Sequence, residues 1–199
     1  GSVPLFYALK NSLNIPTAKL AVDVGLESII DVAFRSGIKS ELKPLPSLSL
    51  GAFELYPMEV AQAYSTIARL GQYKPITSIL LAQDLDGKIL YEYNEEPETV
   101  LLPQTTSVLV GMMKQTIRTG TGRGAFLRGI TQPAAGKTGT TSDTKDAWFA
   151  GFTPHVLTVV WIGYDDNTAH GLTGGSGAVP IWADYMGKIR ARYPEADFK

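Results

Sequence analysis

The chain has 199 residues, of which 44% are hydrophobic, and its formal net charge is -1. The hydrophobic content suffices for a folded core, and the average charge argues against a disordered chain. Lys and Arg are scattered, so nothing in the sequence suggests a basic nucleic-acid surface or a cationic membrane-surface helix. Without cysteine, the chain forms no disulfide and no Cys-ligated zinc site. We therefore expect one folded unit whose partners are neutral or mixed in charge and include no nucleic acid.

The first residues predict that the chain is part of something longer. Gly1-Ser2 resembles a cloning scar, and Val3 already stands in a helical pattern. No apolar run reaches the length of a membrane-spanning helix, and the start lacks the charged and then apolar pattern of a signal peptide. We expect residues 3–199 to be a single domain fragment that is incomplete at the N-terminus.

Residues 3–75 are expected to be mainly helical. Apolar residues recur at helical spacing before and after Pro16, which we expect to stop the first helix. Lys43-Pro44-Leu45-Pro46-Ser47 predicts a loop, because a residue that precedes proline is pushed out of the helical region. Pro57 then suits the first turn of a core helix that ends near Gly71.

The rest of the chain predicts a sheet with helices. Residues 76–93 carry two β-rich runs about Asp86-Gly87, a dipeptide that favours a tight hairpin turn. Residues 104–118 have the apolar spacing of a buried helix. Three strand-like runs within 134–164 favour an antiparallel meander, and residues 180–190 predict a closing helix. This order indicates an α+β fold, with helices packed on an antiparallel sheet and a cleft at its edge.

The run from Ala135 to Thr141 carries the first chemical signal. Side chains alternate along a strand, so Thr138 and Thr140 share one face and Lys137 must reach around the edge. An edge strand offers unpaired backbone groups to an extended peptide, the hydroxyls suit its terminal carboxylate, and Gly139 permits close approach. On its own, such a short pattern more often marks an ordinary strand with a solvated lysine.

A phosphate-binding loop is the alternative for the same residues, since Gly136-Lys137-Thr138 matches the end of Gly-x-x-x-x-Gly-Lys-Thr. The first glycine of that motif would fall at position 131, which is Thr131. A phosphate loop must also open a helix, whereas the residues after Lys137 predict a strand. The sequence therefore argues against nucleotide binding.

Ser12-Leu13-Asn14 carries the second signal, at the expected end of the first helix. Ser and Asn are common at helix ends, because their side chains bond to free backbone groups. The functional interpretation needs Ser12 as a proton relay and Asn14 as an amide that orients a substrate carbonyl, which is acyl-transfer chemistry. His155 and His170 lack a surrounding carboxylate pattern, so neither a metal nor a cofactor is expected.

Two further patterns are given structural interpretations. Trp148 and Phe149 are neighbours on a predicted strand, so one should face the core and the other the helices or the cleft. We expect core packing for both. Thr119-Gly120-Thr121-Gly122 is interpreted as a helix stop and a tight turn.

Five blocks of the sequence together resemble the transpeptidase domain of class A penicillin-binding proteins. They occur in the family's order and span almost the whole chain: residues 8–14, 57–64, 120–123, 136–141 and 146–151. The resemblance implies the fold of serine β-lactamases and transpeptidases, with Ser-x-Asn at Ser12 and Asn14 and Lys-Thr-Gly at 137–139. It makes Ser12, Asn14 and Lys137 catalytic and makes Thr138, Gly139 and Thr140 substrate-binding, with the Thr140 N–H as half of an oxyanion hole.

The resemblance implies a D,D-transpeptidase. In this family a serine attacks the penultimate D-alanine carbonyl of a peptidoglycan stem peptide, and an amine of a neighbouring stem then resolves the acyl-enzyme. Penicillins and other β-lactams would acylate the same serine. The family also implies a glycosyltransferase domain, a membrane anchor and an extracytoplasmic location, none of which is visible in these residues.

The family's Ser-x-x-Lys motif, which carries the nucleophile and precedes Ser-x-Asn, is missing. Three stretches match it as text: Ser36 with Lys39, Ser40 with Lys43, and Ser142 with Lys145. We expect none of them to place both side chains on one helix face, as activation of the serine requires, and all three follow Ser12. The nucleophile is therefore expected from the N-terminal segment of the same protein, supplied as a separate chain.

Three hypotheses remain open at this point. In the first, the chain is the C-terminal part of an active transpeptidase. In the second, it is a catalytically inert fragment that at most binds carboxylate-terminated peptides. In the third, the superfamily is right but the reaction is D,D-carboxypeptidase or β-lactamase hydrolysis.

Overall fold

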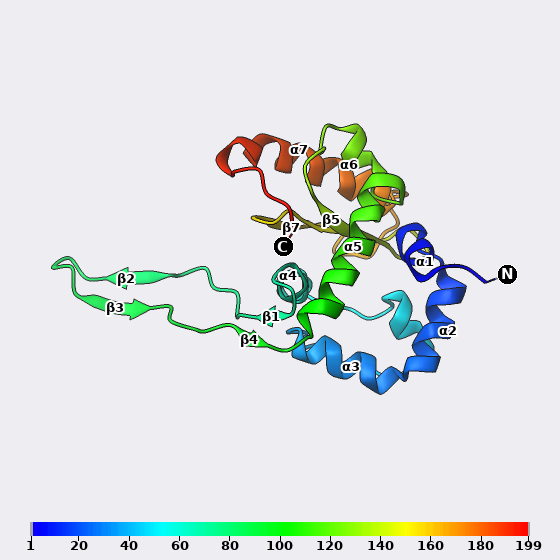
Figure 1. The fold of residues 1–199 in the computed structure, drawn as a ribbon, viewed down its shortest axis with the longest axis horizontal. Coiled ribbons are helices and arrows are strands. Elements are labelled where there is room, and N and C mark those ends of the chain that lie inside the picture. Colours follow the sequence, from blue (N-terminus) through cyan, green and yellow to red (C-terminus); the bar gives the residue numbers. More distant parts are fainter. Residues whose placement is uncertain (1, 199) are drawn as a thin grey trace.

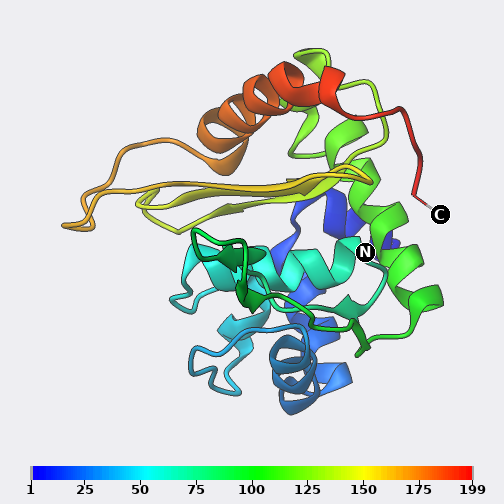
Figure 2. The same ribbon diagram turned by 90° about the vertical axis from the view of Figure 1, so that its left-hand side faces the viewer.

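The computed structural model describes residues 2–198, and its central sheet lies between two helical layers (Figure 2). Strands β5 (Ala135–Thr140), β6 (Ala147–Phe152) and β7 (Leu157–Ile162) form an antiparallel meander in that order. Helices α6 (Arg123–Leu127) and α7 (Val179–Ile189) cover one face, and α4 (Pro57–Ala68) and the N-terminal helices lie on the other side (Figures 1 and 2). The α+β fold and the meander are confirmed.

The remaining elements connect these layers. They are α1 (Leu5–Asn11), α2 (Asn14–Val24), α3 (Leu26–Arg35), the 3-10 turn η1 (Pro46–Leu50), β1 (Gln72–Tyr73), β2 (Leu81–Gln83), β3 (Ile89–Glu92), β4 (Glu98–Thr99), α5 (Pro103–Thr119), the π-helical turn η2 (Gly174–Ala178) and the 3-10 turn η3 (Arg190–Arg192). Within residues 2–198, no helix has the length and apolar character needed to cross a bilayer.

The first helix ends differently from the expectation. Helix α1 stops at Asn11 because Ser12 adopts the left-handed conformation, with φ 54°. Pro16 lies in the first turn of α2, where its missing N–H removes no intrahelical hydrogen bond. The prediction that Pro16 stops the first helix is therefore wrong. The sharp turn at Ser12 separates α1 from α2 instead.

Two polar side chains of α4 join this helix to the segments on either side of it. The Glu59 carboxylate accepts hydrogen bonds from the backbone N–H of Lys39 and Ser40, both at 2.8 Å, and from the Ser40 hydroxyl at 2.6 Å. The buried Gln62 amide donates to the Lys74 carbonyl at 3.0 Å and accepts from the Ile76 N–H at 2.8 Å. These hydrogen bonds join α4 to residues 39–40 before it and residues 74–76 after it.

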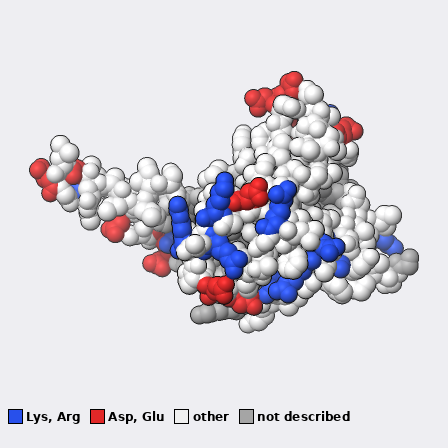
Figure 3. Space-filling view, turned by 90° about the horizontal axis from the view of Figure 1, so that it is seen from above, with Lys and Arg blue, Asp and Glu red and all other residues white. Residues whose placement is uncertain are grey.

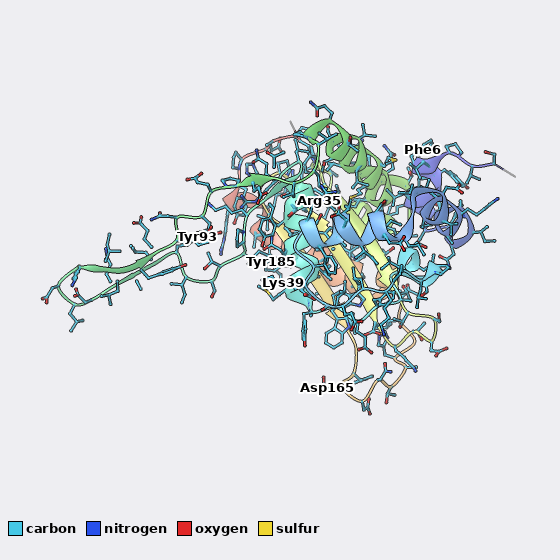
Figure 4. The ribbon with its side chains drawn as sticks, turned by 90° about the horizontal axis from the view of Figure 1, so that it is seen from below. Phe6, Arg35, Lys39, Tyr93, Asp165 and Tyr185 are labelled. Atoms are coloured by element: carbon cyan, nitrogen blue, oxygen red, sulfur yellow. The ribbon has the colours of Figure 1, made fainter. Side chains whose placement is uncertain are left out.

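Residues 76–97 form an arm that projects far from the body (Figure 1). Its strands β2 and β3 pair antiparallel, as the sequence predicts, and Tyr93 lies at its base (Figure 4). The loop is wider than a two-residue turn, because the Asp84 N–H donates to the Lys88 carbonyl at 3.0 Å and so encloses residues 85–87. Asp84 Oδ1 accepts hydrogen bonds from the N–H groups of Asp86 and Lys88 at 3.0 and 2.9 Å. Acidic side chains lie along the arm, and the body carries both basic and acidic side chains on this face (Figure 3).

Separate apolar clusters pack on the two faces of the sheet. On the α7 face, the rings of Phe149 and Trp182 meet edge to face with centroids 5.1 Å apart, and both side chains are fully buried. On the opposite face, Phe152 packs with Val110 and Met113 of α5. Because successive side chains of β6 alternate, Trp148 lies on the α5 face. These two clusters fix the orientation of β5, the strand that carries the predicted motif.

Candidate active site

Lys137 and Ser12 meet at the edge of the sheet, although 125 positions separate them. Lys137 Nζ donates hydrogen bonds to Ser12 Oγ and to the Thr138 carbonyl, both at 2.8 Å. The left-handed turn at Ser12 directs the chain away from the axis of α1, and this places the hydroxyl beside β5. Since the lysine donates to Ser12 Oγ, the Ser12 hydroxyl hydrogen can point toward a bound substrate.

Burial lowers the pKa of Lys137 from 10.5 to about 8. A half-buried ammonium has lost part of its hydration, and this disfavours the charged form. A fraction of the lysine is therefore neutral near physiological pH, so the group can both accept and return a proton. The pair of Lys137 and Ser12 has the properties of a proton relay.

The loop after α5 holds this pair in place. The Thr121 N–H donates to the Lys10 carbonyl at 3.0 Å, next to the end of α1. Gly120 permits this approach, because a methyl group there would lie 2.3 Å from the same carbonyl oxygen. The Thr121 hydroxyl also lies 2.6 Å from the hydroxyl of Thr138. Residues 120–122 therefore connect the turn that bears Ser12 to the strand that bears Lys137.

Thr138 and Thr140 present backbone groups to the open edge of β5. The Thr141 N–H donates to the Asp146 carbonyl across the β5–β6 turn. The backbone N–H and C=O groups of every second residue before it, Gly139 and Lys137, therefore point toward β6, and those of Thr138 and Thr140 point to the open edge. The Thr140 hydroxyl accepts a hydrogen bond from the Gly174 N–H at 2.9 Å. An extended peptide could therefore pair with this edge and place its carboxylate at the hydroxyls.

A glycine-rich turn supports Thr140 from the α7 face. A methyl group at Gly174 would lie 2.4 Å from the Trp148 carbonyl and 2.6 Å from the Gly139 carbonyl, so only glycine fits against the strand. Thr173 and Ser176 form a reciprocal capping box around this turn. Because η2 continues into α7, this helical segment begins directly beside Thr140.

The structure brings together five of the six predicted site residues. Lys137, Thr138, Gly139 and Thr140 lie consecutively on β5, and Ser12 contacts Lys137. Asn14 is exposed at the first position of α2, two residues from Ser12, and its side chain makes no hydrogen bond among residues 2–198. It remains a predicted contact for substrate.

Sequence reasoning missed two residues of the site. The sequence predicts only a helix stop and a tight turn at Thr121. Its place in one of the five blocks of the resemblance was the signal that could have marked it as a site residue. Gly174 had no local signal, because its role depends on contact with Thr140, 34 positions earlier. The expectation of core packing is confirmed for Phe149 and is wrong for Trp148, which is half-buried on the other face of the sheet.

The alternative sites do not assemble. None of the three textual Ser-x-x-Lys pairs lies within one helix: Ser36 follows the end of α3, Ser40 is in a loop bound to Glu59, and Ser142 is in the β5–β6 turn. The phosphate-loop alternative fails, since Gly136-Lys137-Thr138 is β-strand. Within residues 2–198, no group of three or more His, Cys, Asp or Glu side chains could hold a metal ion.

Comparison with known proteins identifies the family. The model of the penicillin-binding protein transpeptidase domain matches residues 1–187. Penicillin-binding protein 1B of Vibrio cholerae is 37% identical over 196 residues, which cover 98% of this chain and 25% of that protein. Penicillin-binding protein 1A of Aquifex aeolicus is 40% identical over 202 residues, which cover 100% of this chain and 27% of that protein. The chain thus spans about a quarter of the length of these relatives.

Solved structures have the same fold. The crystal structure of penicillin-binding protein 1A from Haemophilus influenzae matches with a TM-score of 0.92 at 24% identity, over 99% of this chain and 36% of that chain. PonA1 from Mycobacterium tuberculosis matches with a TM-score of 0.89 at 25% identity, over 100% of this chain and 58% of that chain. The chain therefore belongs to the penicillin-binding protein transpeptidase family, as a transpeptidase domain of the class A type.

Proposed function

We propose that this chain is the substrate-holding part of a D,D-transpeptidase that cross-links peptidoglycan stem peptides ending in D-Ala-D-Ala. The observation that carries the proposal is the hydrogen bond from Lys137 Nζ to Ser12 Oγ at the open edge of β5. This contact places a proton relay beside an edge strand that suits an extended, carboxylate-terminated peptide. Membership of the transpeptidase family supports this reaction class.

In the first step, a serine oxygen attacks the penultimate D-alanine carbonyl. The C–N bond to the terminal D-alanine breaks, and the serine proton passes through Ser12 and Lys137 to the leaving nitrogen. Thr138 and Thr140 bind the terminal carboxylate, and Asn14 holds the amide of the donor. The outward N–H of Thr140 stabilises the oxyanion that forms on the carbonyl oxygen.

In the second step, an amine of a neighbouring stem attacks the acyl-enzyme ester. Its proton returns through the same relay of Ser12 and Lys137, the ester C–O bond breaks, and the serine recovers its hydrogen. β-Lactams would enter at the first step, because their strained amide is attacked by the same serine. The product is a new amide between two stem peptides.

The nucleophile is supplied by sequence outside this chain. The chain spans about a quarter of its relatives, and none of the three textual Ser-x-x-Lys pairs lies on one helix. The partner is the N-terminal segment of the same protein, present as a separate chain. Because peptidoglycan lies outside the cytoplasmic membrane, we place the working enzyme there, anchored through a part that these residues do not contain.

Covalent labelling with a fluorescent penicillin, followed by peptide mapping, tests the proposal. We expect label only when an upstream Ser-x-x-Lys segment is added, and on the serine of that segment. Label on Ser36, Ser40 or Ser142 of the chain alone would contradict it. If the assembled protein takes no label, the inert-fragment alternative is favoured. Transfer of the donor acyl group to an added amine, rather than to water, separates a transpeptidase from a carboxypeptidase or a β-lactamase.

A further inference from the structure

The two hydroxyls that we expect to hold the substrate carboxylate each have a second polar group beside them. Thr140 Oγ1 accepts a hydrogen bond from the Gly174 N–H at 2.9 Å. Since an N–H group can only donate, the Thr140 hydroxyl hydrogen is available to a ligand. Thr138 Oγ1 lies 2.6 Å from Thr121 Oγ1, and either oxygen can be the donor. The direction of this second bond decides whether Thr138 can also donate to a ligand.

A bound carboxylate fixes the direction of the bond between Thr121 and Thr138. An ionised carboxylate only accepts hydrogen bonds, so the Thr138 hydroxyl hydrogen must point to it. The contact of 2.6 Å is then a hydrogen bond only if the Thr121 hydroxyl donates to Thr138 Oγ1. The result is a chain of two O–H groups that ends on a negative charge. Each bond in such a chain polarises the next, and a bond to a charged acceptor is stronger than one to a neutral acceptor.

The backbone on both sides of the Thr121 side chain is held in place. The Thr121 N–H donates to the Lys10 carbonyl at 3.0 Å, and the next N–H, of Gly122, donates to the Thr116 carbonyl at 3.0 Å. A methyl group at Gly175 would lie 3.0 Å from the Thr121 carbonyl oxygen, so the turn η2 packs against this peptide group. The Thr121 hydroxyl is therefore pre-organised beside β5, and this lowers the entropy cost of ordering it when a ligand binds.

We infer that Thr121 is a positioning residue for the carboxylate end of the substrate. Its hydroxyl donates to Thr138 Oγ1 and so directs the Thr138 hydroxyl hydrogen toward the carboxylate, which Thr121 itself does not touch. The inference rests on the proposed function, which puts that carboxylate at Thr138 and Thr140. It adds a source of selectivity, because the hydrogen-bond chain favours a ligand with an ionised terminus over a ligand whose terminus is an uncharged ester.

Acylation kinetics of the protein assembled from this chain and its upstream Ser-x-x-Lys segment test the inference. The probes are benzylpenicillin, which has a carboxylate, and its methyl ester, which has none. Stopped-flow measurements over a range of concentrations separate the dissociation constant before acylation from the acylation rate constant. Thr121→Val keeps the shape of the side chain without its hydroxyl. In this variant we expect the dissociation constant of benzylpenicillin to rise about threefold to tenfold, and that of the ester by less than about twofold. Neither acylation rate constant should change appreciably.

Two further variants complete the test. Thr121→Ser keeps the hydroxyl and should restore the wild-type dissociation constant. The matched control is Thr119→Val, two residues earlier, which loses a hydroxyl that bonds to the Gln115 carbonyl and to Lys10 Nζ and should change neither ligand. If Thr121→Val lowers the melting temperature, Thr121→Ala takes its place in the comparison.

The outcomes separate this inference from the proposed function. Equal weakening of the two ligands in Thr121→Val, no weakening of either, or no restoration by serine would overturn the positioning role, while acylation of the wild type leaves the proposed function standing. If the assembled wild type is acylated by neither ligand, both the proposed function and the positioning role are contradicted.

Discussion

Lys137 donates a hydrogen bond from Nζ to Ser12 Oγ at 2.8 Å, and this contact joins the edge strand of the sheet to the turn between α1 and α2. Two segments 125 positions apart in the sequence thereby meet in the proposed proton relay. Thr121, in the loop at residues 120–122, contacts both segments: its N–H donates to the Lys10 carbonyl, and its hydroxyl lies beside the Thr138 hydroxyl. Substitutions at these points should separate effects on chemistry from effects on folding.

Lys137→Ala should abolish the relay with little loss of stability. In the protein that supplies the nucleophile, we expect acylation by penicillin to slow by about 100-fold or more, because positioned proton transfer contributes this much. The melting temperature should change little, since removal of a partly desolvated charge offsets the lost packing. The control is Lys145→Ala, in the β5–β6 turn. Parallel loss of stability and acylation would mean that Lys137 is structural.

The lowered pKa of Lys137 predicts a pH-dependent stability. The folded chain loses this proton at about pH 8, whereas the unfolded chain keeps it until about pH 10.4. Between these values the unfolded state binds more protons, so the free energy of unfolding rises with pH. Below about pH 8 the cost of burying the charge is fully present.

Chemical denaturation of wild type and Lys137→Met at several pH values measures this effect. The stability advantage of the methionine variant should be largest below about pH 8 and should shrink as the pH approaches about 10.4. If the difference in the free energy of unfolding between the two proteins does not depend on pH, burial does not lower the pKa of Lys137.

Gly120→Ala should destabilise the chain, because the new methyl group would lie 2.3 Å from the Lys10 carbonyl and 2.9 Å from Thr116 Cα. We expect a loss of about 1–3 kcal/mol in the free energy of unfolding. The matched control is Gly111→Ala in α5, where the methyl group meets nothing within 4 Å and should stabilise by about 0.5–1 kcal/mol. Similar changes in both variants would refute the close approach.

Glu59 should contribute stability that acid removes. Burial alone would raise the pKa of Glu59, but hydrogen bonds from the Ser40 hydroxyl and from the N–H groups of Lys39, Tyr56 and Ser40 lower it below its usual value. The contribution is complete above about pH 4.3 and is lost as the pH falls through the folded pKa. Glu59→Ala should cost about 2 kcal/mol in urea denaturation at neutral pH.

The control for Glu59 is Glu54→Ala, an exposed position before the same helix, which should change stability by less than about 0.5 kcal/mol. If wild type and Glu59→Ala lose stability equally between about pH 5 and pH 3, the carboxylate is not the acid-sensitive group.

Replacing residues 79–91 of the arm by a short Gly-Ser turn should leave the body intact. The arm projects away from the body, and its apolar side chains are exposed, including Leu85, Leu90 and Leu80. We expect the free energy of unfolding to change by less than about 1 kcal/mol in thermal or urea denaturation. A larger loss would mean that the arm stabilises the body.

Local patterns predicted the elements that local forces control. The meander of β5, β6 and β7 and the buried helix α5 follow from side-chain periodicity and turn residues, which each segment carries itself. The same logic was wrong at Pro16, because proline is tolerated in the first turn of a helix and the left-handed turn at Ser12 ends α1. The five ordered blocks added the family, and with it the expected roles of Ser12, Asn14 and residues 137–140.

The sequence by itself determined the fold class and the edge strand, and it predicted six site residues, of which the structure brings five together. The tertiary structure alone decided that Lys137 reaches Ser12, that Thr121 and Gly174 support the threonines, and that Trp148 is only half-buried on the α5 face of the sheet. These relationships depend on hydrogen bonds and steric fits between distant segments. Such contacts produce no periodic pattern in the sequence, because they stabilise the protein only after packing has brought the partners together.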